Sequence, residues 1–538
     1  MICIVIKYSQ EEFMKKLITL FLALVMVLSM FAACSDKKPQ EQPEGSESTP
    51  SSGGETPSAS DIPSTGDDAP STAGPGGETT PPEVETSVNQ AIGIPEDLNY
   101  EGNEFTIVHW EPSMDEFDVS AEDQTGDPIL DAIYKRNIYT EDLLDVELNF
   151  IHNQYISNTV AGMNTWCDNL QNIMSDPSTP VDVFASYSRV LSTATVRGFN
   201  QDITVYDNID LTKEWWPSAI IDELSIDGKL FIFTGDISTN VLHMMYAFFY
   251  NKTMAEAYGL PDMIELVENK EWTIDKMIEL TSMAYQDMAA DGKTPDDQFG
   301  ITFDWWNPDA IIQGADFKIL EADKSGDSYI KITEEFFGET FDSFIDKLGD
   351  WAKQSAVFDD PDSTGKAGVA FDEGRAMFYI SNLSKGFSLQ ELDIDYSVIP
   401  SPLRDQNQER YRTALANSYT NYGMSRGCKD GERAAAVIST LGYYGYKLTT
   451  PAIFDVTFKG KFSKDPTMID MLDRIRSGIS FDMGLLYMRE LASINDKPTQ
   501  AILNNTDWLG VAMNAFQQKS LNTLLRKFNG KLETAVNG

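Results

Sequence analysis

Residues 104–110 read EFTIVHW, a short apolar run rich in β-branched and aromatic side chains that predicts a buried strand. Residues 131–145 carry apolar side chains at helical spacing, and residues 146–151 again have a strand pattern. A second helical stretch at 163–174 precedes another strand at 181–185. This alternation predicts an α/β domain with a mainly parallel sheet.

The ends of the predicted strands indicate where a ligand would lie. In open α/β sheets, ligands bind beyond the carboxyl ends of the strands. Trp110 and Glu111 follow the first strand, and Ser186 and Tyr187 follow the third. We therefore expect these four side chains near a binding site.

The rest of the body continues the alternation of helices and strands. Further elements are predicted at 242–251, 252–259, 274–283, 299–302, 368–380, 429–446 and 466–476. The sequence VIPSP at 398–402 predicts a linker. Residues 94–538 are too many for one hydrophobic core, so two lobes are expected.

The N-terminus has the pattern of an exported lipoprotein. Two lysines precede an uncharged apolar run at 17–33, which ends in small residues followed by Cys34. This pattern predicts a signal peptide over residues 1–33. The Cys34 thiol is then the acceptor of a diacylglycerol, whose two acyl chains anchor stably where one would not. An uncleaved membrane span is the alternative, because 17–33 lies at the lower limit for crossing a bilayer. Either Met1 or Met14 is the initiating residue.

Residues 35–89 contain no Leu, Met, Phe, Trp or Tyr. A segment of Ser, Thr, Pro, Gly and acidic residues cannot bury enough apolar surface to offset its ordering entropy. We expect residues 34–93 to be a lipidated, disordered stalk with a reach of roughly 40 Å.

Charge and cysteine content exclude several classes of function. The formal net charge is −43, with 41 Lys and Arg against 84 Asp and Glu, which disfavours nucleic acids and anionic lipid surfaces. Cys167 and Cys428 are the cysteines of the body; they either pair or stay isolated. The sequence has no cysteine–histidine cluster for zinc, no nucleophile elbow and no phosphate loop. We expect no metal and no cofactor.

A series of short motifs follows this α/β pattern in a fixed order. They are GD at 126–127, DAIYKRN at 131–137, IDL at 209–211, WW at 215–216, GKLF at 228–231, GD at 235–236, YNK at 250–252, YGL at 258–260, WT at 272–273, FDEGRAM at 371–377, PSP at 400–402, SKD at 463–465, ML at 471–472 and FD at 481–482. In this order and spacing, together with the lipoprotein signal, the chain resembles the extracellular solute-binding proteins of family one. These are the carbohydrate-type receptors of ABC importers.

The resemblance implies two α/β lobes joined by hinge crossovers, a periplasmic-binding-protein-like fold that closes over ligand. By this resemblance, one lobe spans 94–235 and 353–402, and the other spans 236–352 and 403–538. It further implies a monomer that receives a carbohydrate, an oligosaccharide, and passes it to membrane permease subunits. The protein would work at the outer face of the cytoplasmic membrane.

A sugar site needs rings for the C–H faces and polar groups for the hydroxyls. Trp305 and Trp306 follow the FGIT strand and are the first aromatic candidates, together with Trp110 and Tyr187. The polar and remaining candidates are Glu111, Ser186, Asp236, Asn307, Asp309, Asn382, Asn417 and Tyr419. Each has a structural alternative: a Trp pair often packs in a core, and Asp236 could cap a helix.

Two functional alternatives remain open. One is a secreted carbohydrate-active enzyme, since acidic residues are too abundant to exclude a catalytic pair. The other is the same receptor fold with a peptide or polyamine ligand. Residues 323–334 partly match a calcium loop, but Ser328 stands where that loop needs glycine, so a β-turn is expected there.

Overall fold

The computed structural model describes residues 87–111, 123–154, 157, 159–454 and 466–537. The predicted signal peptide, Cys34 and most of the predicted stalk lie outside the described residues. The stalk prediction runs too far toward residue 93, because Val88–Ile92 forms a helix, α2. Ser87 caps its first turn, and Ile92 is buried against the core, so this segment belongs to the folded body.

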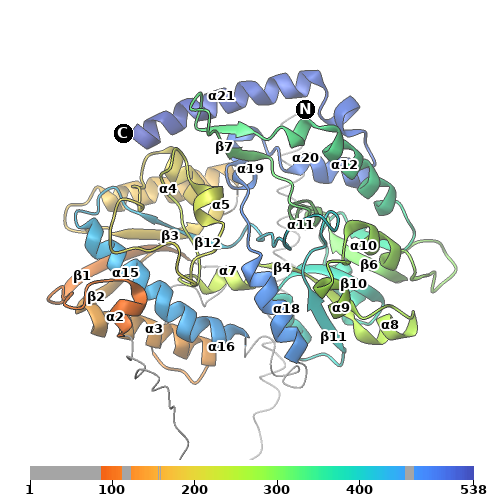
Figure 1. Ribbon diagram of the computed structural model, residues 1–538, viewed down its shortest axis with the longest axis horizontal. Helices are drawn as coiled ribbons and strands as arrows, with labels where there is room; N and C mark the ends of the chain where they lie inside the picture. Colours follow the sequence, from red (N-terminus) through yellow and green to blue (C-terminus); the bar gives the residue numbers. More distant parts are fainter. Residues whose placement is uncertain (1–86, 112–122, 155–156, 158, 455–465, 538) are drawn as a thin grey trace, which may run out of the picture. The chain divides into compact units, whose positions relative to one another are not determined.

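The first sheet confirms the α/β prediction (Figure 1). Its strands lie in the order β12-β3-β1-β2, with β1 parallel to β2 and β3, and β12 antiparallel to β3. Helices α3 and α4 make the crossovers that parallel strands require. The bounds are β1 Asn103–Glu111, α3 Pro128–Leu144, β2 Val146–Gln154, α4 Val160–Met174, β3 Val183–Tyr187 and β12 Thr420–Met424.

Local sequence explains where α3 begins and ends. The Asp127 carboxylate accepts hydrogen bonds from the backbone N–H groups of Ile129 and Leu130, both at 2.9 Å. These bonds satisfy donors that a helix N-terminus otherwise leaves unpaired. Asp145 ends the helix in a left-handed conformation with φ of 51°. β2 begins at the next residue, so the chain reverses onto the sheet within one residue.

The second sheet has the order β11-β4-β10-β6-β5, with β9 beside β6. Strands β6, β9 and β10 are parallel to one another, and β4 and β5 are antiparallel to their partners. Helices α8, α10, α12 and α13 contact its strands. The bounds are β4 Tyr246–Asn251, α8 Lys252–Ala257, α10 Ile274–Thr281, β5 Tyr285–Gln286, β6 Gln298–Asp304, α12 Glu339–Ala352, β9 Val357–Asp360, α13 Lys366–Asp372, β10 Ala376–Asn382 and β11 Tyr396–Ile399.

Aromatic side chains form the core beside this second sheet. Trp272 stacks on Phe378 with ring centroids 5.9 Å apart, and Trp351 stacks on Phe303 at 5.5 Å. The indole N–H of Trp351 donates to Thr281 Oγ1 at 2.9 Å. These buried rings thus combine a large apolar area with a satisfied polar group.

The structure differs from the sequence expectations in the second half of the chain. The expected linker at 398–402 includes the end of β11, and the expected strand at 242–251 begins only at Tyr246 because α7 (Thr239–His243) precedes it. Strands β9, β10 and β11 pair in the second sheet, although 353–402 was expected with the first lobe. Strand β12 pairs in the first sheet, although 403–538 was expected with the second. Backbone pairing to distant strands decides this membership, and local sequence does not encode it.

Two connections join the sheets, one between β3 and β4 and one between β11 and β12, and they pair with each other and with residues 478–480. Met245 forms an antiparallel bridge with Leu415, and Thr413 forms a parallel bridge with Ile479. The backbone N–H of Thr413 donates to Gly478 O at 2.8 Å. We call residues 244–246, 413–416 and 478–480 the hinge ribbon; the first two of these segments lie on the connections between the sheets.

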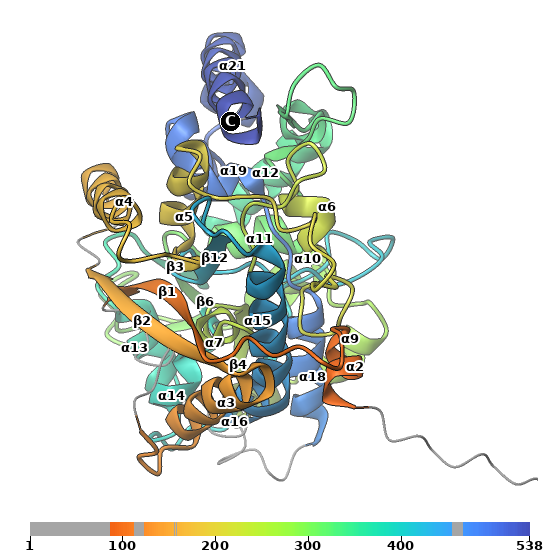
Figure 2. The same ribbon diagram turned by 90° about the vertical axis from the view of Figure 1, so that its left-hand side faces the viewer.

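The C-terminal helices and the hairpin at 320–332 form a further group of elements, here called the cap. It consists of α19 (Met483–Leu486), α20 (Asp496–Asn504), α21 (Ala515–Asn537) and the hairpin of β7 (Leu320–Ala322) and β8 (Ile330–Ile332). In Figures 1 and 2, α21 lies at the end of the body opposite α3 and α16. The expected turn at 323–334 is confirmed as this hairpin, in which the Asp323 carboxylate accepts from Ser325 and Ser328.

The remaining elements connect or cover these layers. They are α5 Ser188–Val196, α6 Ile220–Leu224, α9 Met263–Glu268, α11 Pro308–Gly314, η1 Glu335–Phe337, α14 Lys385–Leu389, α15 Gly431–Tyr444, η2 Gly445–Thr449, α16 Thr450–Phe454, α18 Pro466–Ser477, η4 Met488–Leu491 and η5 Trp508–Ala512. Among the described residues, no helix has the length and apolarity needed to cross a membrane.

Candidate functional site

The carboxyl end of the first sheet holds three aromatic candidates. The Trp110 and Tyr187 rings lie 6.0 Å apart, and Trp110 Nε1 donates to Thr420 Oγ1 at 3.1 Å. Trp110, Tyr187 and Tyr419 are all buried, with 7% or less of their surface exposed. Burial also raises the pKa of Tyr419 to about 12. These rings therefore pack as core beneath this end of the sheet. Glu111 ends β1, and its side chain lies outside the description.

Ser186 lies beside these rings and is fully buried. It pairs with Asn421 across β3 and β12. Its hydroxyl has no hydrogen-bond partner among the described residues. A buried hydroxyl without a partner is uncommon in folded proteins, because its desolvation is then uncompensated.

The carboxyl end of the second sheet carries Trp305 and Trp306. Their rings meet edge to face at 5.8 Å; Trp305 is half-buried and Trp306 is 38% exposed. Asn307 fixes the turn after β6, because its Oδ1 accepts from the backbone N–H of Asp304 at 2.7 Å. The Trp pair thus presents ring surface to solvent, whereas Trp110 and Tyr187 do not.

Two carboxylates beside this Trp pair have raised pKa values. Asp304 pairs in register with Asp360, and burial together with the Asp360 charge raises the pKa of Asp304 to about 6. Burial raises the pKa of Asp309 to about 7; the nearby Asp496 adds to this, while a Thr499 hydrogen bond of 2.9 Å and the Arg189 charge oppose it. Desolvation therefore outweighs the cations and donors that face these groups.

Sequence reasoning missed Arg189, which lies in the first turn of α5. Its side chain is 92% buried, since only 8% of the residue is exposed, and its charge acts on Tyr187 and Tyr419 in the first sheet. The same charge acts on Asp309 in α11. Arg189 thus links the ends of the two sheets. The only signal in the sequence is its place two residues after Tyr187, at a predicted strand end.

Asn382 and Asn417 lie against the hinge ribbon. Asn382 Nδ2 donates to Met244 Sδ at 3.8 Å, and Ser418 Oγ contacts the same sulfur at 3.1 Å. Ser188 Oγ donates to Asn417 O at 2.6 Å, so Asn417 contributes its backbone. The structure therefore brings the end of β10 and the connection between β11 and β12 together at Met244.

Asp236 is the predicted site residue that lies apart from the rest. Its buried carboxylate forms an ion pair with Arg476 at 2.5 Å. Burial raises its pKa, and Arg476 opposes that shift. Asp236 and Arg476 line a cavity of about 470 Å³ together with Trp216, and none of the other predicted site residues lines it.

Two small cavities lie beside the predicted site residues. One is lined by Asn417 and Tyr419, the other by Asp309, and both are lined by Gln313 and Asp482. Each has a volume of about 20 Å³, which is room for one water molecule. Neither cavity therefore admits a larger ligand in this conformation.

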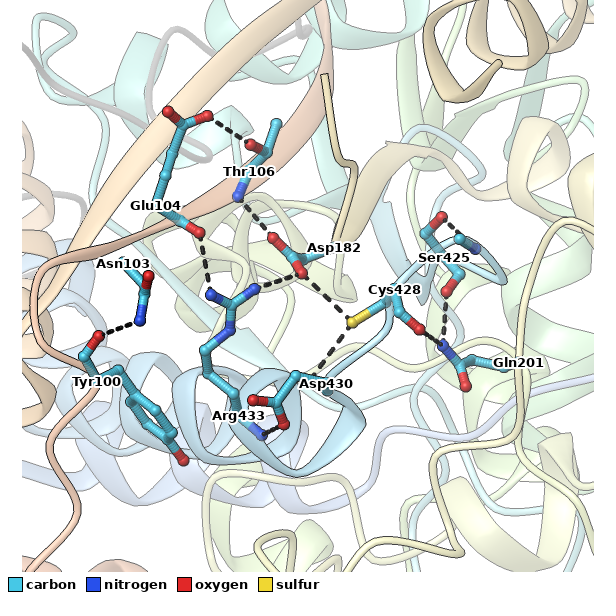
Figure 3. A network of polar contacts seen from close by, with 11 residues as sticks. Tyr100, Asn103, Glu104, Thr106, Asp182, Gln201, Ser425, Cys428, Asp430 and Arg433 are labelled. Atoms are coloured by element: carbon cyan, nitrogen blue, oxygen red, sulfur yellow. Dashed lines mark hydrogen bonds and ion pairs between the residues drawn. The ribbon is translucent and has the colours of Figure 1, made fainter. Parts of the chain in front are cut away.

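The two body cysteines are both free. Burial raises the pKa of each thiol to about 12, which makes both poor nucleophiles at neutral pH. Cys428 donates to Asp182, whose carboxylate also pairs with Arg433 at 2.8 Å and accepts from the backbone N–H of Thr106 (Figure 3). This network ties α15 to the amino end of the first sheet, far from the predicted site.

No group of His, Cys, Asp and Glu in the described residues is arranged to hold a metal ion.

Comparisons with known proteins give one family and several solved structures. Residues 159–441 match the model of the bacterial extracellular solute-binding proteins. No curated protein matches the chain. A cyclo/maltodextrin-binding protein complexed with maltotetraose aligns at 13% identity over 81% of this chain and 100% of its own, with a TM-score of 0.49.

Two further structures align similarly. The galacto-N-biose/lacto-N-biose I-binding protein of an ABC transporter from Bifidobacterium longum, in complex with lacto-N-biose, has 14% identity, coverage of 80% and 98%, and a TM-score of 0.49. An ABC substrate-binding protein from Listeria monocytogenes, in complex with cycloalternan, has 13% identity, coverage of 80% and 99%, and a TM-score of 0.46. The family match covers more than half of the sequence and confirms the resemblance found in its motifs: the chain belongs to the bacterial extracellular solute-binding proteins.

Proposed function

We propose that the chain is the lipid-anchored receptor of an ABC importer and that it binds a carbohydrate, an oligosaccharide, between the carboxyl ends of its two sheets. Family membership supports extracytoplasmic solute binding. The observation that carries the choice of ligand is the partly exposed pair Trp305 and Trp306, beside the carboxylate of Asp304. Rings of this kind cover the C–H faces of sugars, and nearby carboxylates accept hydrogen bonds from sugar hydroxyls.

Thermal unfolding with a panel of oligosaccharides tests the ligand class. A Cys34→Ser variant without the lipid would be heated with maltotetraose, cellotetraose and xylotetraose, and with a tetrapeptide and spermidine. A ligand that binds only the folded protein raises the melting temperature in proportion to its saturation. We expect one of the sugars to do so. A rise only with the peptide or with spermidine would overturn the carbohydrate assignment.

The same incubations separate a receptor from an enzyme. Chromatography of the sugars after prolonged contact with the protein should return them unchanged. Shortened products that scale with protein concentration would establish the enzyme alternative instead.

The membrane anchor is tested at Cys34. In cells, the wild-type chain should fractionate with membranes and incorporate labelled fatty acid, and Cys34→Ser should lose both properties. Cys167→Ser is the matched control, because that thiol is buried in the body and free. Membrane association of Cys34→Ser would indicate the uncleaved span instead.

A further inference from the structure

We call each sheet with the helices that contact it one half of the molecule. The cap contacts the second half. Its helix α20 contacts α11 and α12, and Thr499 Oγ1 donates to Asp309. Trp508 lies 5.3 Å from the Phe341 ring of α12, and its indole N–H donates to Phe336 O at 3.0 Å. These contacts anchor the cap to the second half, and α19 also contacts α5 of the first half.

Helix α21 is fixed to the other cap elements along its middle. Asn529 Oδ1 accepts from the backbone N–H groups of Tyr329 and Ile330, both at 3.0 Å, and Asn529 Nδ2 donates to Ile330 O at 2.9 Å. Phe528 lies 5.0 Å from the Tyr487 ring. The Asn529 amide thus makes the hydrogen bonds with the backbone of β8 that a neighbouring strand would otherwise make.

The C-terminal end of α21 contacts the first half of the molecule. Arg426 donates to Ala535 O at 2.9 Å, and Lys229 Nζ donates to Val536 O at 2.9 Å. Arg426 directly follows the bridge of Ser425 to Asn200, and its backbone N–H donates to Phe199 O at 2.7 Å. Lys229 lies four residues before Phe233, which forms a bridge with Tyr422 of β12, so both cations belong to the first half. The α21 helix also contacts α5 of that half.

The chemistry of this contact suits a helix end. The last carbonyl groups of a helix have no donors within the helix, and cations are favoured there by the helix dipole. Next to this contact, Asp227, the turn at Gly326–Tyr329 and Arg526 line an open cavity of about 900 Å³. The helix end also packs through apolar side chains, since Leu532, Ala535 and Val536 are buried.

We propose that α21 is a latch: it is rooted in the second half and held to the first half by Arg426 and Lys229 at its C-terminal carbonyl groups. Separation of the halves about the hinge ribbon must release this end. The latch stabilises the closed form of the receptor. A ligand gains access when the bonds of Arg426 and Lys229 to the end of α21 break. This device depends on the two-sheet fold and holds whatever the ligand is.

Double electron–electron resonance without ligand tests the latch. Nitroxides at Lys135→Cys on α3 and Glu256→Cys on α8 report the separation of the halves, and both native positions are exposed. The measurement uses the Cys34→Ser background, and the thiols of Cys167 and Cys428 label slowly because burial raises the pKa of each to about 12. In the Arg426→Met, Lys229→Met variant, we expect a longer distance population that the wild type lacks. Lys527→Met, which removes an exposed cation of the same helix, is the matched control and should leave the distances unchanged.

Hydrogen exchange of the last turn of α21 completes the test. The double methionine variant should exchange faster at Ala535 and Val536 than the wild type and Lys527→Met, with α-helical circular dichroism retained. Faster exchange with an unchanged distance distribution would overturn the latch, because the end would then be free without opening the molecule. Unchanged exchange with unchanged distances would overturn it too, because the two cations would then not hold the helix end.

Discussion

The carboxyl ends of the two sheets differ in how they use aromatic side chains. At the first sheet, Trp110 and Tyr187 are buried, and the Trp110 indole N–H is already paired with Thr420. At the second, Trp306 is 38% exposed and rests against Trp305. The same residue type after a predicted strand therefore supports the fold in one half and offers a surface in the other.

The largest expected effect is on stability in the first half. Trp110→Ala removes a fully buried ring and its hydrogen bond, and large-to-small core substitutions of this kind cost about 3–5 kcal/mol of unfolding free energy. Trp306→Ala should cost clearly less, about 1 kcal/mol, because 38% of the Trp306 surface is already exposed. Urea unfolding of both variants measures the difference. Equal losses would show that the two ends are built alike.

A second difference between the carboxyl ends of the two sheets is the protonation of a carboxylate. Asp309, near the end of the second sheet, has a folded pKa of about 7 against an ordinary value of 3.8. Between about pH 4 and about pH 7, the folded protein keeps a proton that the unfolded chain has lost, so stability falls as pH rises through this window. Asp309→Asn removes this term while its amide oxygen still accepts from Thr499. The variant should equal the wild type near pH 4 and be about 1–3 kcal/mol more stable at pH 8.

Chemical unfolding at several pH values measures this effect. Asp323→Asn is the control, because that exposed carboxylate has its pKa lowered by Ser325 and Ser328 and titrates below this window. If the stability of the wild type and of Asp309→Asn has the same pH dependence from pH 4 to pH 8, the carboxylate is compensated and the contrast in charge between the two ends is lost.

A smaller effect is expected on ligand affinity at the end of the second sheet. If Trp306 covers a sugar face, Trp306→Ala should weaken binding of the sugar that stabilises the protein by roughly 10-fold, equivalent to about 1.4 kcal/mol. Phe516→Ala is the matched control, because Phe516 is 75% exposed and lies in the cap. Titration calorimetry measures both affinities. An equal affinity of the Trp306→Ala variant and the wild type would place the ligand elsewhere.

The sequence predicted what depends on local pattern. The predicted strands at 104–110 and 181–185 and the predicted turn within 323–334 follow from hydrophobic spacing and turn residues, although β1 extends to Glu111 and β3 to Tyr187. It could not predict that β10 pairs with β4, or that β12 returns to β3, because strand order is set by pairing between distant segments. It also could not distinguish buried Trp110 from exposed Trp306. That distinction depends on which elements, such as β12 with Thr420, pack over the ring.

Arg189 illustrates the remaining gap between sequence and site. Apart from its place two residues after Tyr187, nothing in its sequence neighbourhood indicates this role, since the charge of Arg189 acts on Asp309 from a distant part of the chain. The cap is a similar case, because the anchoring of α21 by Asn529 and Arg426 involves partners about 200 and 109 residues away. Long-range contacts of this kind carry no local signal.

The smallest expected effect is the change in stability on removal of the Ser186 hydroxyl. It tests whether the carboxyl end of the first sheet is only core. Ser186→Ala removes a buried hydroxyl that has no partner among the described residues, so stability should stay within about 1 kcal/mol of the wild type or rise. Ser188→Ala, two residues later, removes a hydroxyl that donates to Asn417 O at 2.6 Å and should cost about 0.5–1.5 kcal/mol. Urea unfolding separates the two. If Ser186→Ala is the more costly variant, that hydroxyl is satisfied in the folded protein, and the first end is a sealed core with no donor left to offer a ligand.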